Sequence, residues 1–138
     1  MNEEHLRRAI ALAAEARAGG NPPFGSLLAD QDGIVLVEER NTTRTDDDIS
    51  AHPELKVARW AARNLDADTA AKTTMYTSCE PCAMCSGALA RSGIGQVVFA
   101  LSAAQLDGLR TAGGFPSVPT EGPHLYDEAK APVEGYYP

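Results

Sequence analysis

One histidine and two cysteines in this sequence have the types and spacing of a metal site. His52 lies in the segment AHPE, and Cys82 and Cys85 lie in the segment EPCAMC. Two cysteines three residues apart on one helical turn can direct both thiolates at one ion, and zinc prefers thiolate and imidazole ligands. Three protein ligands leave a fourth tetrahedral position open, as in catalytic zinc sites. The pattern therefore predicts a catalytic zinc bound by His52, Cys82 and Cys85.

Glu54 follows the histidine by two residues and is the candidate proton carrier of this site. Zinc lowers the pKa of a coordinated water from about 15.7 towards 7, and a neighbouring carboxylate can take the proton and pass it to a substrate. Taken alone, Glu54 has a second interpretation, because acidic residues are also favoured in the first turn of a helix. Its place between the two ligand segments favours the proton shuttle.

A third cysteine, Cys79, leaves other interpretations of the cluster open. All three cysteines of the chain fall within seven residues. Cys79 could complete a four-ligand structural site with the predicted ligands, and a CxxC pair alone is also typical of redox proteins. An iron–sulfur run would need a fourth cysteine. We favour a small buried residue, because Cys79 belongs to the end of the preceding strand rather than to the helical turn.

The two ligand segments open helices expected at residues 52–64 and 82–93, with Pro53 and Pro81 where proline is favoured. These helix starts should also stabilise the thiolates. Leu55, Ala58, Ala62 and Leu65 of the first of these helices are expected to face the core. Further helices are expected at 3–18 and 103–109, and strands within 21–30 and at 34–38, 73–78 and 95–100, the first two as a hairpin. This order predicts an α/β fold, a mixed sheet with helices on both faces.

Composition and charge limit the classes of function. The chain has 138 residues, enough for one domain (1–138), and its 43% hydrophobic content is typical of a soluble globular protein. The first 20 residues carry acidic side chains and helical rather than continuous apolar spacing, so we expect no signal peptide and a cytoplasmic location. The net charge is −7, and the residues after Leu101 carry two basic and five acidic side chains. Nothing here predicts the basic surface that binding to nucleic acid requires, and no apolar run predicts a membrane segment.

The combination H-x-E followed by P-C-x-x-C resembles the signature of the zinc-dependent deaminases of the cytidine/deoxycytidylate deaminase superfamily. The segment YTSCEPCAMCSGAL resembles the guanine deaminases, and SGIGQVVFA resembles the tRNA adenosine deaminases. PPFGSLLAD is similar to the guanine-deaminase loop that places a phenylalanine over the base. The resemblance spans residues 3–107. It departs from the family at Pro53, where a small residue is usual, and proline restricts the backbone of His52.

The resemblance implies a three-layer α/β/α sandwich with a mixed five-stranded sheet, and a homodimer in which a tail, here about residues 121–138, packs on the partner subunit. It places Asn41, Phe24 and Ala51 at the substrate. Asn41 would hydrogen-bond the ring edge, although it could be only a turn residue, and Phe24 would either stack on the base or pack in the core.

The implied reaction replaces a ring amino group by a carbonyl and releases ammonia. A free nucleobase or base analogue, such as guanine, cytosine or an aminated triazine, is the leading substrate class. Arg91, where guanine deaminases carry an aromatic residue, weakens a strict guanine assignment. Adenosine in tRNA is an alternative substrate, which the segment SGIGQVVFA supports and the acidic net charge opposes. A further alternative is that the chain is a non-catalytic structural zinc protein of the same fold.

Overall fold

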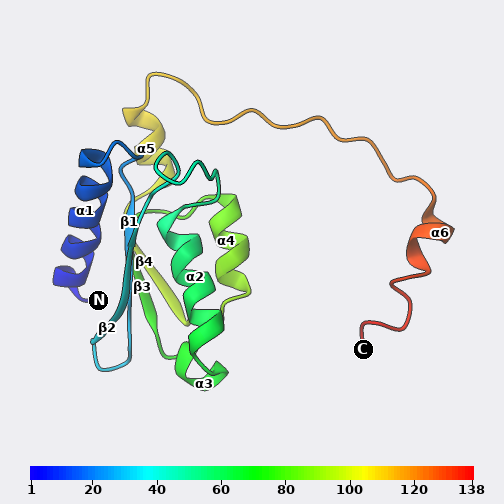
Figure 1. The fold of residues 1–138 in the computed structure, drawn as a ribbon, viewed down its shortest axis with the longest axis horizontal. Helices are drawn as coiled ribbons and strands as arrows, with labels where there is room; N and C mark the ends of the chain where they lie inside the picture. Colours follow the sequence, from blue (N-terminus) through cyan, green and yellow to red (C-terminus); the bar gives the residue numbers. More distant parts are fainter.

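The computed structural model describes residues 1–138 and has three layers, a mixed sheet between helices (Figure 1). Strands β1 (Gly25–Ala29), β2 (Val35–Arg40), β3 (Thr74–Cys79) and β4 (Gln96–Leu101) lie in the order β2-β1-β3-β4. Helix α1 (Glu3–Ala18) covers one face, and α2 (Pro53–Asn64) and α4 (Ala83–Ala90) cover the other. The short helices are α3 (Ala67–Ala70), α5 (Ala103–Leu109) and α6 (Tyr126–Lys130). The predicted α/β fold with a mixed sheet is confirmed.

The sheet has four strands, so the five-stranded sheet that the resemblance implies is wrong for this chain. β1 pairs antiparallel with both β2 and β3, and β3 pairs parallel with β4. β4 remains an edge because the chain after Leu101 turns into α5. Beyond α5 it runs through a segment rich in glycine and proline, which weaken a strand or remove its ladder hydrogen bonds.

Two apolar clusters, one on each face, hold the helices to the sheet. Strand β1 is buried along its whole length. On one face Leu27 and Tyr76 pack with Ala9 of α1, and on the other Leu28 and Met75 pack with Val57 of α2. The inward face expected for α2 is correct for Ala58, whereas Ala62 is exposed and Leu55 is half-buried. Because both faces of β1 are buried, α1 is held on one face of the sheet and α2 on the other.

Three connections meet at one end of this sheet. Phe24 immediately precedes β1, Asn41 immediately follows β2, and Glu80 immediately follows β3. Because β1 is antiparallel to its two neighbours, its first residues pair with the last residues of both, Gly25 with Arg40 and Ser26 with Thr77. The pairing of the strands therefore brings the loops that carry the predicted site residues to one end of the sheet.

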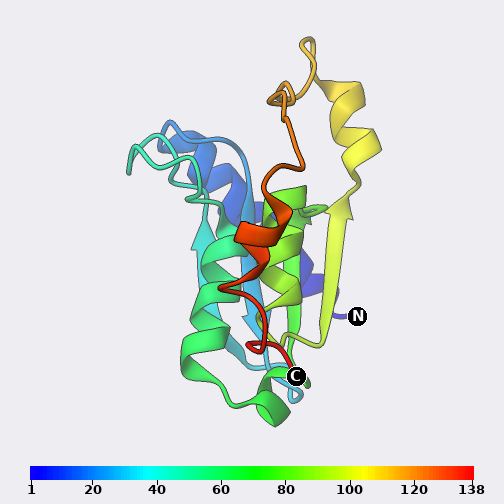
Figure 2. The same ribbon diagram turned by 90° about the vertical axis from the view of Figure 1, so that its right-hand side faces the viewer.

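Residues 110–138, called the arm below, stand away from the rest of the chain. In Figure 1 the arm leaves α5 and lies off the side of α2 and α4, and Figure 2 shows it crossing in front of these helices. None of the buried residues belongs to the arm, so the exposed stretch begins earlier than the tail expected at about 121–138. No helix of the chain has the length and apolar character needed to cross a membrane.

Candidate active site

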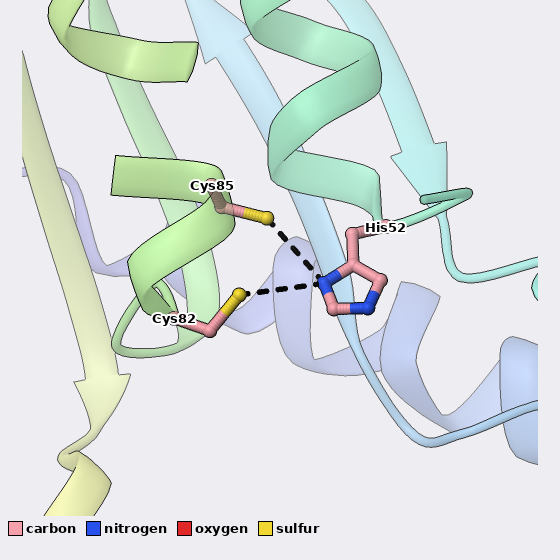
Figure 3. Close-up of side chains that lie close together, drawn as sticks. All are labelled: His52, Cys82 and Cys85. Atoms are coloured by element: carbon pink, nitrogen blue, oxygen red, sulfur yellow. Dashed lines mark hydrogen bonds between the residues drawn. The ribbon is translucent and has the colours of Figure 1, made fainter. Parts of the chain in front are cut away.

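The first turns of α2 and α4 place the predicted metal ligands opposite each other. His52 is the N-cap of α2 and has an extended backbone with φ −81° and ψ 142°, the conformation that a following proline favours. Pro53 therefore fits the site, because it sets the backbone from which the imidazole projects. Cys82 is the N-cap of α4, and Cys85 lies in its first turn. The two helices pack side by side, so the imidazole reaches both sulfurs (Figure 3).

The distances within this group suit a tetrahedral zinc. Nδ1 of His52 lies 3.4 Å from Sγ of Cys85 and 3.7 Å from Sγ of Cys82. Usual zinc–sulfur and zinc–nitrogen bond lengths put such a pair of ligand atoms about 3.6 Å apart. One ligand atom from each residue lies within 4.8 Å of the others, so His52, Cys82 and Cys85 could hold a metal ion together.

Glu54 is buried beside this group, with 6% of its surface exposed. Its Oε1 is the one fully enclosed side-chain polar atom that has no hydrogen-bond partner in the protein. Burial raises the pKa of Glu54, and hydrogen bonding, including that with the Cys85 side chain, opposes this increase. An unpartnered buried carboxylate oxygen is costly, which indicates that Glu54 is placed for a ligand or a proton rather than for packing.

Burial also controls the other ionisable side chains of the group. It raises the pKa of the Cys85 thiol, and the nearby Glu54 and Cys82 raise it further. Burial lowers the pKa of His52. The effects at Cys85 all oppose its thiolate. A divalent cation at this group would offset them, because coordination favours the deprotonated thiol.

The predicted substrate residues lie at the same end of the sheet. The backbone N–H of Asn41 donates to the carbonyl of Phe24 at 3.0 Å, and that of Thr42 donates to the carbonyl of Ala51 at 3.1 Å. Ala51, which directly precedes His52, is buried, and Phe24 is half-buried. These two hydrogen bonds join three segments that lie far apart in the sequence and place them next to the His52 segment.

The comparison with known families agrees with this geometry. The sequence model of the cytidine and deoxycytidylate deaminase zinc-binding region matches residues 1–101. This chain belongs to the cytidine/deoxycytidylate deaminase family. The matched part runs from α1 to β4 and includes His52, Glu54, Cys82 and Cys85.

Relatives of this chain differ in the substrates that their names state. A probable cytosine deaminase of Schizosaccharomyces pombe is 35% identical over 152 residues, covering 96% of this chain and 90% of that protein. A tRNA-specific adenosine deaminase of Haemophilus influenzae is 35% identical over 101 residues, 73% of this chain and 58% of that protein. A guanine deaminase of Bacillus subtilis is 40% identical over 89 residues, 64% of this chain and 56% of that protein.

A crystal structure of guanine deaminase from Bacillus subtilis superposes on 99% of this chain and 94% of its own, with a TM-score of 0.78 and 27% identity. Since the superposition covers nearly the whole chain, it includes most of the arm.

Cys79 lies outside the ligand group. It is buried at the end of β3, and the cluster that could hold a metal consists of His52, Cys82 and Cys85. Burial is the main cause that raises the pKa of its thiol. The geometry therefore favours the interpretation of Cys79 as a small buried side chain over a four-ligand structural site.

Asn21, near the site, has structural partners that the sequence does not reveal. Its side chain, 7% exposed, accepts from the backbone N–H groups of Arg44 and Thr45. Asn41 has a local partner, since Thr43, two residues further on, donates twice to its side chain as in a turn. In the sequence, Asn21 precedes two prolines and reads as a loop residue. Because its partners lie more than 20 residues away, no local pattern identifies the contact.

Proposed function

We propose that this chain is a zinc-dependent hydrolytic deaminase that converts a ring amino group to a carbonyl and releases ammonia. The single observation that carries the proposal is the enclosed Oε1 of Glu54, which has no hydrogen-bond partner in the protein and lies beside the group formed by His52, Cys82 and Cys85. A structural zinc site has no use for a buried carboxylate oxygen that is left without a partner. This is the argument against the alternative of a non-catalytic zinc protein.

Glu54 carries the proton transfers in the proposed reaction. Zinc, when bound by the three ligands, would supply a coordinated water with a lowered pKa. Glu54 would take one proton from this water as the water oxygen adds to the ring carbon that bears the amino group, and would deliver it to the adjacent ring nitrogen. Glu54 would then carry the proton of the added hydroxyl to the amino group, so that the C–N bond breaks, ammonia leaves and the ring keeps a carbonyl. The raised pKa of the Glu54 carboxyl suits a group that must both accept and donate a proton.

The remaining residues bind and orient the ring. Phe24 offers an apolar face for stacking, Asn41 offers an amide to the ring edge, and Ala51 is buried directly before His52. The backbone from Ser78 to Glu80 orients the leaving amine. The hydroxyl of Ser78 accepts a hydrogen bond from the backbone N–H of Gly25 at 3.1 Å, which ties the Phe24 loop to this segment.

A small free base or base analogue, of the guanine, cytosine or aminated triazine type, is the substrate class that we favour. The charge of the whole chain is −7, and the arm is acidic, so the approach of a polyphosphate is opposed. The names of the cytosine and guanine deaminase relatives agree with a free base. Adenosine in tRNA stays the second candidate, because a relative with that name is 35% identical over 73% of this chain.

A comparison of substrates tests this proposal. The zinc-loaded protein is assayed for ammonia release with guanine, cytosine, an aminotriazine and a tRNA anticodon stem-loop, at low and at physiological salt. We expect a free ring to have the highest kcat/KM, with little dependence on salt. A higher kcat/KM for the stem-loop, with binding that weakens steeply as salt rises, would select the tRNA alternative. Failure to release ammonia from any of them would select the non-catalytic alternative.

We also propose that the arm docks on a second copy of this chain. A groove of about 290 Å³ lies between α2 and α4, lined in part by Leu55, Ala62 and Ala88 and by Arg59 and Arg91. The arm carries exposed tyrosines and valines together with acidic side chains at positions 127, 128 and 134. The apolar and charged groups of the arm thus complement those of the groove, while the arm stands away from α2 and α4 of its own chain (Figure 1).

Light scattering after gel filtration tests this second proposal. We expect the mass of a dimer for the parent and of a monomer when Arg59 and Arg91 are both replaced by Glu. Arg7→Glu, an exposed change on α1, is the matched control and should remain dimeric. A parent that is monomeric at all concentrations would contradict the proposal. The cytoplasmic location expected from the sequence stays a prediction.

A further inference from the structure

The side-chain amide of Asn41 can have only one orientation in this fold. Its Oδ1 accepts two hydrogen bonds from Thr43, one from the backbone N–H and one from the hydroxyl, both at 2.9 Å. A backbone N–H can only donate, so it must face the oxygen of the amide and not the nitrogen. Thr43 therefore uses both acceptor positions of Oδ1, and the Nδ2 group of the same amide is directed away from Thr43.

The Nδ2 group of Asn41 is left for a ligand. It makes no hydrogen bond within the protein, although only 2% of the residue is exposed. It is also not among the fully enclosed unpartnered atoms, since Glu54 Oε1 alone has that property. Nδ2 thus keeps a small accessible surface at the end of the sheet where Phe24 and Ala51 lie. To a ligand there, Asn41 presents two N–H donors and no acceptor.

Contacts on both sides hold the segment that carries this amide. Before it, Nζ of Lys56 donates to the carbonyl of Arg40 at 3.0 Å and to the hydroxyl of Thr42 at 2.6 Å. After it, Asn21 accepts from the backbone N–H groups of the next two residues, both at 3.1 Å. Thr43 lies between these two anchors. It cannot move away from Asn41 unless one of the anchoring contacts breaks.

We propose that Thr43 is a positioning residue that fixes Asn41 as a donor, so that the substrate ring must present an acceptor to it. A carbonyl oxygen or an unprotonated ring nitrogen fits this requirement, whereas a ring N–H or a second amino group at that edge is rejected. A buried donor facing another donor leaves both unpaired. This inference rests on the proposed deaminase function, and it adds which ring edges the site accepts.

A double-mutant cycle separates positioning from a merely structural role. Thr43→Val removes the hydrogen bond from the hydroxyl but keeps the one from the backbone N–H. We expect KM to rise about 5-fold, the factor that corresponds to one hydrogen bond, with little change in kcat. Thr43→Ser keeps the hydroxyl and should restore the parent KM. In an Asn41→Ala background, Thr43→Val should have no further effect on KM, because Thr43 acts through the amide. An unchanged KM in Thr43→Val, or an equal effect in both backgrounds, would overturn the assignment.

Asn41→Asp tests the donor requirement directly. The carboxylate keeps an oxygen for Thr43 but presents an acceptor to the ring, so we expect KM to rise at least about 10-fold. A buried carboxylate also lowers the thermal unfolding midpoint, so KM is measured well below that midpoint, on protein whose circular dichroism spectrum matches that of the parent. An equal or lower KM would show that the ring offers a donor there, which overturns the inference.

A parent that releases no ammonia from any ring would refute the proposed function instead. The orientation of Asn41 would then still be measured by NMR of its side-chain amide protons. These protons should shift in Thr43→Val and not in Thr43→Ser. Equal spectra for the two variants would overturn the positioning role.

Discussion

The body of the chain, residues 1–109, and the arm that follows it are built on different principles. The body contains every buried residue, and its strands and helices contact one another on both faces of the sheet. The arm has a short helix but no buried residue. Its Phe115 is almost fully exposed, and its Tyr126 and Tyr137 are largely exposed. Burial of apolar surface stabilises the body, so its geometry is set within one chain. The arm has no such stabilisation from its own chain, and its apolar side chains are available to another molecule.

The largest effect is expected from removing one buried carboxylate of the body. Glu54→Gln keeps the size of the side chain but cannot carry a proton, so turnover of the ring substrate should fall at least about 100-fold. Zinc content, measured by atomic absorption, should stay at one per chain. Glu121→Gln, the same substitution at an exposed position of the arm, is the control and should leave turnover within 2-fold, as expected for a surface change (about ±0.5 kcal/mol). Near-normal turnover by Glu54→Gln would contradict the shuttle.

Glycine-to-alanine substitutions should affect the free energy of unfolding differently in the body and in the arm. A Cβ on Gly25 would lie 2.5 Å from the carbonyl oxygen of Ala9 and 2.5 Å from Cβ of Leu12, where α1 crosses β1. Gly25→Ala should therefore lower the free energy of unfolding by about 1–3 kcal/mol in urea titrations. Gly113→Ala in the arm meets nothing within 4 Å and should have almost no effect. Equal effects at the two positions would remove the distinction between body and arm.

Removing the arm should change assembly more than folding. A chain that ends after Leu109 loses no buried residue, so the body should keep its circular dichroism spectrum and its zinc. Its mass in light scattering should fall from dimer to monomer, because the surface that docks on the partner is gone. A truncated chain that fails to fold would show that the arm stabilises its own body. One that stays dimeric would move the interface elsewhere.

The smallest effect is expected at Cys79, within the body but outside the ligand group. Cys79→Ser should bind one zinc per chain like the parent, whereas Cys82→Ser should lose most of its zinc after mild chelation. Both replace one sulfur by oxygen, so Cys82→Ser is the matched comparison for ligand loss. If Cys79→Ser also loses stoichiometric zinc, the site has four protein ligands and belongs to the structural class.

The sequence by itself determined the local parts of this protein. Helices at 3–18 and 103–109 were expected and are observed with those bounds, because their caps and spacing are local features. Pro53 begins α2 directly after His52, Glu54 lies within one helical turn of the histidine, and Cys82 and Cys85 lie on one turn at the start of α4. Such features depend on neighbours within about four residues, which the sequence displays directly. That the two helix starts face each other, so that His52 reaches both sulfurs, is decided by the packing of α2 against α4.

Only the tertiary structure decided the features that depend on distant partners. The expected fifth strand is missing because no segment after Leu101 pairs with β4, and Ala62 of α2 faces outward although its spacing suited the core. The contact between Asn41 and Thr43 is local, but the segment that carries it is anchored by Asn21 from more than 20 residues away. A spacing pattern specifies which residues share a face, but not which other segment covers that face or which hydrogen bonds it makes. The covering segments and the hydrogen bonds are decided by the sheet, which brings separate loops to one of its ends.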